Sequence, residues 1–421
     1  MLDIKYIRQN PQKVQEGNQA KGFKVDIAQV VALDNEIRPL QQDLEQLQAE
    51  RNKISQEIPK ADTQKREVLK KEVLSIKEKM DGIEGKLNQR RELFNELMLK
   101  IAQPAGDDVP HGKDDSENVE IRKWGTPRHF EFKHKDHIEL GEKLKILDFE
   151  KGVKVSGSRS YVLKGDGALL EQAIMRFAFD LVVKKGFVPY SVPLMVKEEA
   201  MVGTGYFPVG RDQAYFIEKD KLALIGTSEV SLCSMYMNEV LNEEELPIRM
   251  TALTSCFRRE AGTYGKDTRG LYRVHQFNKI EMVILANSDE ELSKKYHQEL
   301  LSISEDVLQA LNLPYRVVYV CTGDLGQGQI RKHDIETWMP SRKGYGETHS
   351  CSTFHDFQAR RLNLRYKNKE GQRQFAYTLN NTALATPRVI LAILENYQEA
   401  DGSIRIPDVL QSYMGGKTHI R

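Results

Sequence analysis

Residues 255–281 read SCFRREAGTYGKDTRGLYRVHQFNKIE and are the most informative part of the chain. Two runs suited to strands, Thr254–Glu260 and Tyr272–Met282, flank a loop rich in glycine and charge, which predicts a β-hairpin. Because side chains alternate between the faces of a strand, Arg258 and Glu260 are expected on one face. On the returning strand, one face is expected to carry His275, Phe277, Lys279 and Glu281.

An arginine beside a stackable aromatic ring suits a nucleotide. The guanidinium can bind phosphate through two hydrogen bonds, and the ring can stack on the base. A solvated hairpin held together by salt bridges would use the same residue types. The hairpin alone therefore leaves both interpretations open.

Upstream, Gly226-Thr227-Ser228-Glu229 follows the apolar run Leu222–Ile225. A hydroxyl and a carboxylate at the end of a strand could hold an amino group. The same residues are also typical of a helix N-cap, since Thr or Ser often precedes Glu there. The two interpretations carry equal weight from this segment alone.

Downstream, Asn380–Ala385 is a run of small and polar residues that leads through Thr386-Pro387-Arg388 into the apolar run Val389–Glu395. Proline suits the first turn of a helix. Positive charge near a helix N-terminus is unfavourable to the helix dipole, so Arg388 indicates either an anion nearby or simple solvation.

Around these three segments, strand-like and helical runs are separated mostly by turns. This pattern favours an α+β domain built on an antiparallel sheet flanked by helices over a regular series of βαβ units. The strand-like runs are Ser160–Leu163, Ala214–Ile217, Arg316–Val320 and Leu362–Tyr366, and the helical runs are Ala168–Lys185, Glu290–Ala310 and Val389–Tyr397.

The N-terminal quarter has a different composition, because residues 27–101 are dense in Leu, Ile, Glu, Gln, Lys and Arg. Apolar residues there recur at steps of three and four, which predicts two long amphipathic helices separated by a turn at Ile58–Asp62. Pro39 is expected to kink the first helix. The two stripes are Leu33, Ile37, Leu40, Leu44, Leu47 and Ile54, and then Val73, Ile76, Met80, Ile83, Leu87, Phe94, Leu97 and Ile101.

Such stripes fit either a dimerising coiled coil or an antiparallel hairpin that seals against itself and leaves its outer surface free for a large partner. Residues 103–120 are rich in Pro, Gly and Asp and are expected to form a linker. The predicted organisation is a helical coiled-coil arm over 1–102, a linker over 103–120 and an α+β domain over 121–421.

Composition excludes several classes of protein. The chain has 421 residues, with 62 Lys and Arg against 61 Asp and Glu, so it is not a uniformly basic nucleic-acid binder. It shows no secretory signal and no apolar run long enough for a membrane span, and we expect a cytoplasmic protein. Its four cysteines form no Cys-x-x-Cys pair, so we expect reduced thiols in or near the core and no zinc site. The phosphate-binding motifs of P-loop and Rossmann proteins are absent.

Taken together, the segments resemble the class II aminoacyl-tRNA synthetases. The hairpin is similar to motif 2, and the small-residue strand that leads to Arg388 is similar to motif 3. Motif 1, a long helix followed by a strand that ends in proline at the dimer interface, resembles Leu169–Lys185, Gly186–Val192 and Pro193.

Within that class the chain resembles the seryl-tRNA synthetase family over essentially its whole length. The order and spacing of the matching stretches make the resemblance specific. They are His137–Lys143 (HIELGEK), Lys154–Arg159 (KVSGSR), Gly226–Glu229 (GTSE), Cys256–Gly262 (CFRREAG), Val274–Phe277 (VHQF), Asp356–Arg361 (DFQARR) and Glu395–Gln398 (ENYQ).

This resemblance implies ATP-dependent activation of L-serine to seryl-adenylate and transfer of the seryl group to tRNA(Ser), and to tRNA(Sec) where the host has one. It assigns serine binding to Thr227, Ser228, Glu229, Arg258, Glu281 and Thr382. It assigns ATP binding to Arg258, Arg259, Glu260, Val274, His275, Gln276, Phe277, Glu347, Thr348, His349, Ser350 and Arg388.

The same resemblance implies that Mg²⁺ accompanies ATP at Glu347 and Ser350, and that Arg258, Glu347 and Arg388 support catalysis. It also implies a homodimer whose N-terminal arm binds the long variable arm of the tRNA, largely by shape. The chain departs from the family at Thr382, where serine is usual, at Asn381 and Ala383, where glycines are expected, and at Thr348-His349.

Two rival functions remain at this stage. A paralogue could activate an amino acid and load it onto a carrier protein, but such proteins tend to lack the long arm. A non-enzymatic module could keep only the fold, but Arg258, Glu281 and Arg388 are all present.

Overall fold

The computed structural model describes residues 1–262 and 269–421, so the central part of the predicted hairpin loop lies outside the described residues. Two units divide the chain between Pro104 and Ala105. Within the described ranges, no helix combines the length and the apolar character that crossing a membrane requires.

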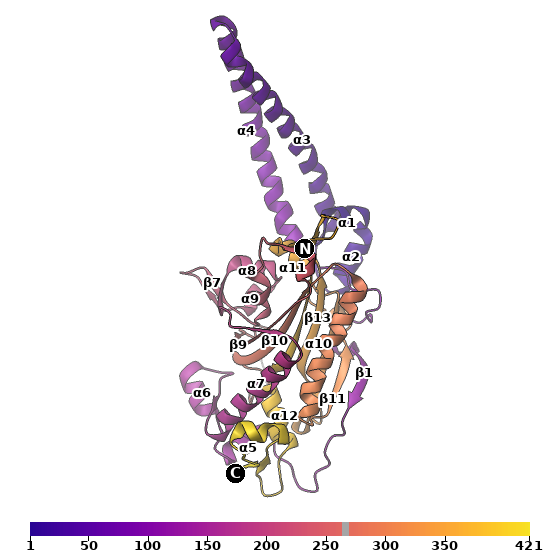
Figure 1. Cartoon of the computed structure of the whole chain (residues 1–421), viewed down its shortest axis with the longest axis vertical. Helices are drawn as coiled ribbons and strands as arrows, with labels where there is room; N and C mark the ends of the chain where they lie inside the picture. The colour runs from indigo at the N-terminus through magenta and orange to yellow at the C-terminus, as the bar shows by residue number, and fades with distance from the viewer. Residues whose placement is uncertain (263–268) are drawn as a thin grey trace. The chain divides into compact units, whose positions relative to one another are not determined.

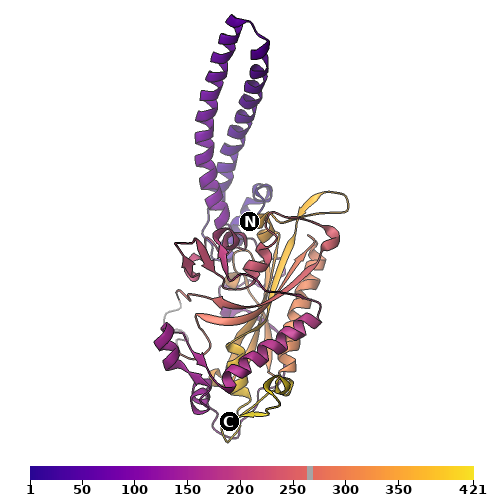
Figure 2. The ribbon, with the colours of Figure 1, turned by 60° about the vertical axis from the view of Figure 1, so that its left-hand side comes forward.

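The first unit contains the predicted pair of long helices, α3 (Ile27–Glu57) and α4 (Thr63–Lys100), joined by the short helix η1 (Ile58–Lys60). Figure 2 shows α3 and α4 lying side by side as a hairpin. The Asp62 carboxylate caps α4 by accepting a hydrogen bond from the Lys65 backbone nitrogen at 2.8 Å. At about 1.5 Å per residue the helices are roughly 46 and 57 Å long. The predicted helical arm is confirmed.

The hairpin is held by an apolar seam between the two helices. The predicted stripes supply it, because their members are buried or half-buried whereas most other positions of α3 and α4 are exposed. Arg90, which interrupts the second stripe, pairs with Glu36 across the hairpin at 2.6 Å. Helix α3 continues through Pro39, which lies on the exposed side. Leu69 and Met98 are also buried and were not predicted.

Two short helices, α1 (Ile4–Gln9) and α2 (Pro11–Ala20), pack on the base of the hairpin and were not predicted. Their fully buried Ile7 and Val14 join Ile27 and Met98 in one apolar cluster. Buried Asn18 fixes the end of the hairpin. Its side chain accepts from the Ala102 backbone nitrogen at 2.8 Å and donates to the Ala102 carbonyl at 3.1 Å.

An eight-stranded sheet organises the second unit. All neighbouring strands are antiparallel except β4 and β9, which confirms the α+β prediction. The strand order is β1 (Val119–Trp124), β11 (Tyr315–Tyr319), β12 (Arg331–Met339), β13 (Gly344–His355), β16 (Tyr377–Ala385), β10 (Gln276–Ala286), β9 (Ile248–Phe257) and β4 (Val188–Tyr190).

Helices pack on both faces of this sheet (Figure 1). On one face, α7 (Asp166–Lys184), α10 (Glu290–Ala310) and α12 (Arg388–Asn396) pack on side chains such as Met282 and Ile284. On the other face, α9 (Glu229–Ser234) and α11 (Phe357–Leu362) pack on Val283 and Leu285. The rest of that second face is polar and lines a cavity.

Smaller elements complete the second unit. They are α5 (His137–Lys143), β2 (Leu147–Asp148), α6 (Phe149–Ser156), β3 (Val162–Leu163), β5 (Met195–Lys197), α8 (Glu198–Gly203), β6 (Phe216–Ile217), β7 (Leu222–Leu224), β8 (Val240–Asn242), β14 (Arg365–Lys367), β15 (Arg373–Phe375), β17 (Ile404–Arg405), α13 (Asp408–Gln411) and β18 (His419–Ile420). All four cysteines are buried with free thiols, as expected.

The predicted strand over Leu362–Tyr366 is wrong in its first half. Helix α11 ends at Leu362, Asn363 adopts a left-handed conformation with φ of 53°, and β14 begins only at Arg365. Leu362, Leu364 and Tyr366 are all buried in one cluster, so their alternation reflects burial across a turn rather than a continuous strand.

The expected linker, residues 103–120, is largely tied to the second unit. The Gly106 backbone nitrogen donates to the Ile330 carbonyl at 3.0 Å, and Asp108 pairs with Arg331 at 2.8 Å. The last two residues of that range already belong to β1.

Candidate active site

A cavity of about 280 Å³ lies on the polar part of the sheet. Its floor comes from β10, β13 and β16, and its rim from the segments that flank β9 and β10 and from the start of α12. The three segments that the sequence singled out therefore meet in one place, although about 150 residues separate Glu229 at the end of the first from Asn380 at the start of the last.

Two irregularities in strand pairing decide which side chains face the cavity. Between β12 and β13, Glu336 pairs with Glu347 and Ile335 with His349, so Thr348 is an extra residue. In a regular strand, residues three apart point to opposite faces. The extra residue places Glu347 and Ser350 on the same face, and both line the cavity.

The second irregularity lies between β10 and β16. Glu281 pairs with Thr382 and Ile280 with Leu384, which leaves Ala383 as the extra residue. Glu281 and Thr382 therefore project from neighbouring strands onto the cavity face. The Thr382 hydroxyl donates to Glu281 Oε2 at 3.4 Å.

Arg258 and Phe277 form the pair that the sequence predicted. The Arg258 guanidinium carbon lies 5.2 Å from the centre of the Phe277 ring, and Arg258 Nε donates to the Gly226 carbonyl at 3.4 Å. Both residues line the cavity. Such a pair can present positive charge to a phosphate and a ring face to a base.

At the opposite side, Arg388 is held by backbone and side-chain contacts. Its Nε donates to the Tyr272 carbonyl at 2.9 Å, and its guanidinium carbon lies 4.4 Å from the centre of the Tyr272 ring. Its Nη1 donates to the Glu347 carbonyl at 2.7 Å and to the Glu347 carboxylate at 3.3 Å. Arg388 therefore bridges motif 2, β13 and its own helix α12.

The charges around Glu347 favour its ionised form. Burial alone raises the pKa of Glu347, but the charges of Arg388 and Lys332 outweigh it and lower the pKa to about 2. The side chain keeps 44% of its surface exposed. An ionised carboxylate and the Ser350 hydroxyl on one face provide the oxygen donors that Mg²⁺ prefers.

The most enclosed end of the cavity holds two carboxylates and one lysine. Lys279 Nζ lies 2.5 Å from Glu281 Oε2, and both side chains are buried. Glu229, also buried, accepts hydrogen bonds from Gln358 Nε2 at 2.6 Å and from Tyr206 Oη at 3.1 Å. Burial, together with the charge of Glu281, raises the pKa of Glu229 to about 7, although these hydrogen bonds oppose the shift. This end can receive a small cationic group.

Several cavity residues were not assigned from the sequence. Lys332 pairs with Asp334 at 2.8 Å, and burial raises the pKa of Asp334 to about 7 even though Lys332 opposes that shift. Arg273 pairs with Glu260 at 2.8 Å. The signal for Lys332 was weak, since one lysine on an alternating strand resembles many solvated lysines. Arg273 lies within the hairpin that the sequence highlighted.

Five predicted residues lie away from the cavity lining. Thr227 and Ser228 are buried at the start of α9, where Thr227 Oγ1 accepts from the Glu229 backbone nitrogen at 3.4 Å, close to the N-cap interpretation. The Arg259 backbone nitrogen donates to the Gln213 carbonyl. His275 and Gln276 line a neighbouring cavity, and His275 Nδ1 contacts the Arg258 carbonyl at 2.9 Å.

Thr348 and His349 border the cavity, but their polar side-chain atoms contact other protein groups. The Thr348 hydroxyl lies 2.7 Å from the Thr337 hydroxyl, and His349 Nδ1 lies 2.8 Å from Thr348 Oγ1. Burial lowers the pKa of His349 to about 4, so this imidazole is neutral near pH 7. The remaining predicted residues, Glu260 and Val274, line the cavity.

The chain is similar to known proteins over nearly its whole length. Residues 1–103 match the family model of the seryl-tRNA synthetase N-terminal domain, and residues 215–397 match that of the class II tRNA synthetase core domain for G, H, P, S and T. A serine–tRNA ligase of Deinococcus radiodurans is 43% identical over 99% of this chain and 98% of its own. One of Fervidobacterium nodosum is 44% identical over 99% of this chain and 98% of its own.

Among solved structures, a seryl-tRNA synthetase of Pyrococcus horikoshii complexed with ATP superimposes with a TM-score of 0.91 at 37% identity. The match covers 100% of this chain and 99% of that one. A cytoplasmic serine–tRNA ligase of Naegleria fowleri in complex with AMP gives a TM-score of 0.86 at 31% identity, with the same coverage of both chains.

Proposed function

The chain belongs to the seryl-tRNA synthetase family, and from this premise we propose how its cavity activates serine and delivers it to tRNA(Ser). The enzyme is an ATP-dependent aminoacyl-tRNA ligase. One observation carries the proposal. Arg258, Phe277, Glu281, Thr382 and Arg388 come from distant parts of the chain and line a single cavity.

In the first step, a carboxylate oxygen of serine attacks the α-phosphorus of ATP, and the bond to the bridging oxygen breaks to release pyrophosphate. Two anions must approach each other, so the site needs fixed positive charge rather than a protein nucleophile. Arg258, which lines the cavity, would contact both the serine carboxylate and the α-phosphate. Phe277 stacks on adenine, and Arg388 binds the γ-phosphate.

Serine binds at the enclosed end of the cavity. Glu281 accepts a hydrogen bond from the serine hydroxyl, next to the Thr382 hydroxyl 3.4 Å away. Glu229 and the start of α9 at Thr227 and Ser228 receive the ammonium group, whose charge favours the ionised form of Glu229. Alanine would lack the hydroxyl that donates to Glu281, and threonine would add a methyl group to a closed end.

Glu347 and Ser350 would hold a Mg²⁺ ion that arrives with ATP, and this ion would neutralise phosphate charge. The resemblance also assigns ATP contacts to Arg259, Glu260, Val274, His275, Gln276, Thr348 and His349. Of these, Glu260 and Val274 line the cavity together with Thr348 and His349, and the other three lie beside it.

In the second step, the terminal ribose hydroxyl of the tRNA attacks the carbonyl carbon of the adenylate, and AMP leaves. The helical arm formed by α3 and α4 binds the long variable arm of tRNA(Ser), and of tRNA(Sec) in a host that has one. We further propose that the enzyme is a cytoplasmic homodimer whose contacts involve α7 and β4. Ligases that load an amino acid onto a carrier protein tend to lack a long helical arm, so the presence of the arm argues against that alternative.

Serine-dependent exchange between ATP and labelled pyrophosphate, without tRNA, tests this proposal. The expected result is exchange with serine and at most a small fraction of that rate with threonine or alanine. Exchange with another amino acid would support the carrier-ligase alternative. No exchange with any amino acid would support a non-enzymatic module and refute the proposal.

A further inference from the structure

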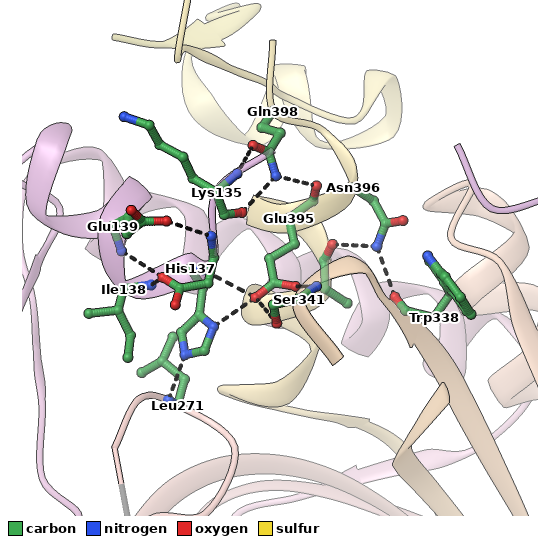
Figure 3. A network of polar contacts seen from close by, with 12 residues as sticks. Lys135, His137, Ile138, Glu139, Leu271, Trp338, Ser341, Glu395, Asn396 and Gln398 are labelled. Carbon is green, nitrogen blue, oxygen red and sulfur yellow. Dashed lines mark hydrogen bonds and ion pairs between the residues drawn. The ribbon is translucent and has the colours of Figure 1, made fainter. Parts of the chain in front are cut away.

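Next to the cavity, a buried network joins four segments that are far apart in the sequence (Figure 3). At its centre is Glu395 on α12, whose side chain is fully buried. Glu395 Oε1 accepts from the His137 backbone nitrogen at 3.1 Å and lies 2.8 Å from His137 Nδ1. It also accepts from the Ser341 hydroxyl at 2.8 Å, and Oε2 accepts from the Ser341 backbone nitrogen at 2.9 Å.

His137 connects Glu395 to the end of the hairpin loop at Leu271. Its Nε2 accepts a hydrogen bond from the Leu271 backbone nitrogen at 3.1 Å. A ring nitrogen that accepts carries no proton, so Nδ1 carries the proton and donates to Glu395. Both ring nitrogens are therefore used, and the imidazole is fixed in one tautomer between a carboxylate and a backbone amide.

The turn before Leu271 is shaped to fit against this ring. Gly270 has a φ of 83°, a conformation that favours glycine. A Cβ at this position would lie 2.3 Å from His137 Nε2. The turn can therefore pack on the imidazole only because residue 270 has no side chain.

The segment that His137 holds includes Tyr272, which contacts Arg388. Residues 269–275 form no helix or strand, so single hydrogen bonds position their backbone. Tyr272 follows Leu271 directly, and its carbonyl and ring contact Arg388 at 2.9 and 4.4 Å. The Arg342 guanidinium also lies 4.1 Å from the centre of the Tyr272 ring, and Arg342 follows Ser341. Glu395 thus anchors the Ser341–Arg342 segment directly and the Gly270–Tyr272 turn through His137, and both segments meet at the Tyr272 ring.

Helix α12 completes the arrangement. Arg388 and Glu395 are seven residues apart, about two helical turns, so they project from the same side of α12. Helix α12 therefore carries Arg388 at its start and Glu395 near its end. Glu395 helps to fix Tyr272, which contacts Arg388.

We propose that His137 and Glu395 are positioning residues for ATP. They hold the Gly270–Tyr272 turn against α12, so that Tyr272 orients the Arg388 guanidinium toward the phosphates. This inference rests on the proposed function for the role of Arg388. Serine binding should not depend on the network, because Glu281 and Thr382 are held by the sheet itself.

The test compares two variants of His137, each of which places an amide group near a different one of the two ring nitrogens. His137→Asn places an amide near Nδ1 and keeps the donor to Glu395, but it cannot reach Leu271. His137→Gln places its terminal amide near Nε2 and can accept from Leu271, while it gives up the side-chain donor to Glu395. Dissociation constants for ATP and, separately, for serine are measured by titration calorimetry on the full chain without tRNA. Circular dichroism and thermal unfolding check the fold.

We expect His137→Asn to weaken ATP binding about tenfold, the effect of losing roughly one buried hydrogen bond. We expect His137→Gln to bind ATP within about threefold of the parent and serine binding to change little in either variant. Unchanged ATP binding in His137→Asn, equal weakening of ATP and serine binding, or no recovery in His137→Gln would overturn the inference.

Should His137→Asn fail to fold, Glu395→Gln tests the branch of the network that reaches Tyr272 through Ser341 and Arg342, because its amide would oppose the Ser341 backbone nitrogen. The same selective loss of ATP affinity is expected, and unchanged affinity would overturn the inference. The binding measurements do not use the reaction, so a parent enzyme without serine-dependent exchange would refute the proposed function separately.

Discussion

Most charged side chains that line the cavity form ion pairs. Lys279 pairs with Glu281, Lys332 with Asp334 and Arg388 with Glu347. A buried charge is tolerated when it is compensated, and removing one member of such a pair leaves the other uncompensated. Arg258 differs, because within residues 1–262 and 269–421 it forms no ion pair. Its guanidinium contacts the Gly226 carbonyl and the Phe277 ring.

This difference leads to a prediction for Arg258→Ala. The variant should lose serine-dependent pyrophosphate exchange by at least about 100-fold, because it lacks the charge that stabilises the reacting phosphate. Its thermal unfolding midpoint should stay close to that of the parent, since no carboxylate is left unpaired. Exchange assays and thermal denaturation measure the two quantities.

Arg249→Ala is the matched control, because Arg249 lies at the other end of β9 and pairs with Glu299 at 3.1 Å. It should keep full exchange activity and lose at most about 1 kcal/mol of stability. Equal loss of exchange in the two variants would contradict the role given to Arg258.

A second prediction at this scale concerns Glu229, whose pKa of about 7 lies well above the ordinary value of 4.5. Between pH 4.5 and 7 the unfolded chain loses this proton while the folded protein keeps it. The contribution of Glu229 to stability is therefore fully present below pH 4.5 and is lost as the pH rises to 7. The loss amounts to about 3 kcal/mol.

Glu229→Gln removes this proton exchange and can keep the contacts to Gln358 and Tyr206. The free energy of unfolding of the variant minus that of the parent should rise by about 3 kcal/mol between pH 4.5 and 7. Denaturant titrations of the free enzyme at several pH values measure it. A pH-independent difference would mean that Glu229 is ionised throughout.

At the scale of strands and helices, the sequence predicted which elements meet but not every side chain that faces the cavity. Strand-like and helical runs predicted the β-hairpin around residues 255–281 and the helices α7, α10 and α12. They could not reveal the extra residues Thr348 and Ala383, because a bulge depends on pairing with a neighbouring strand. Without the bulge, Glu347 and Ser350 would not share a face.

The same limit explains why His275 lies outside the cavity lining, whereas Gln276 lies on the opposite face of β10 from Phe277. Alternation placed His275 on the face of Phe277, but β10 begins only at Gln276. Before that point, tertiary hydrogen bonds direct the chain, and the imidazole contacts the Arg258 carbonyl. Single-sequence patterns carry no information about such long-range tethers.

A prediction for the arm follows from its seam. Leu87 is 1% exposed, whereas Leu74 on the same helix is 58% exposed. Leu87→Ala should destabilise the arm by about 2–5 kcal/mol, because it leaves a cavity in the seam. Leu74→Ala should change stability by less than about 0.5 kcal/mol.

Limited proteolysis of α3 and α4 measures the effect, and both variants should keep serine-dependent exchange. Faster cleavage in Leu74→Ala than in Leu87→Ala would show that the seam does not hold the arm together.

At the scale of the whole molecule, the chain combines two units with separate apolar cores, one for the arm and one for the sheet. The order of motifs along the sequence predicted both. It did not predict α1 and α2, whose stability comes from packing on the base of the hairpin. Nor did it predict that Ala105–Asn118 is tied to the second unit, because proline, glycine and aspartate are equally typical of a mobile linker.

Separate cores predict separable activities. Replacing residues 45–82 by a short Gly-Ser loop removes the outer part of the hairpin and keeps its base. Serine-dependent pyrophosphate exchange should stay within about twofold of the parent, while charging of tRNA(Ser) should fall by at least about 100-fold. Parallel loss of both activities would argue against this division.

The central claim is that one chain activates serine in the cavity and selects its tRNA with the arm. The most direct measurement is serylation by the full chain of tRNA(Ser) and of the same tRNA with its long variable arm shortened. We predict efficient charging of the intact tRNA and charging of the shortened one that is weaker by at least about 100-fold. Equal charging of the two, or no charging of either, would contradict the account.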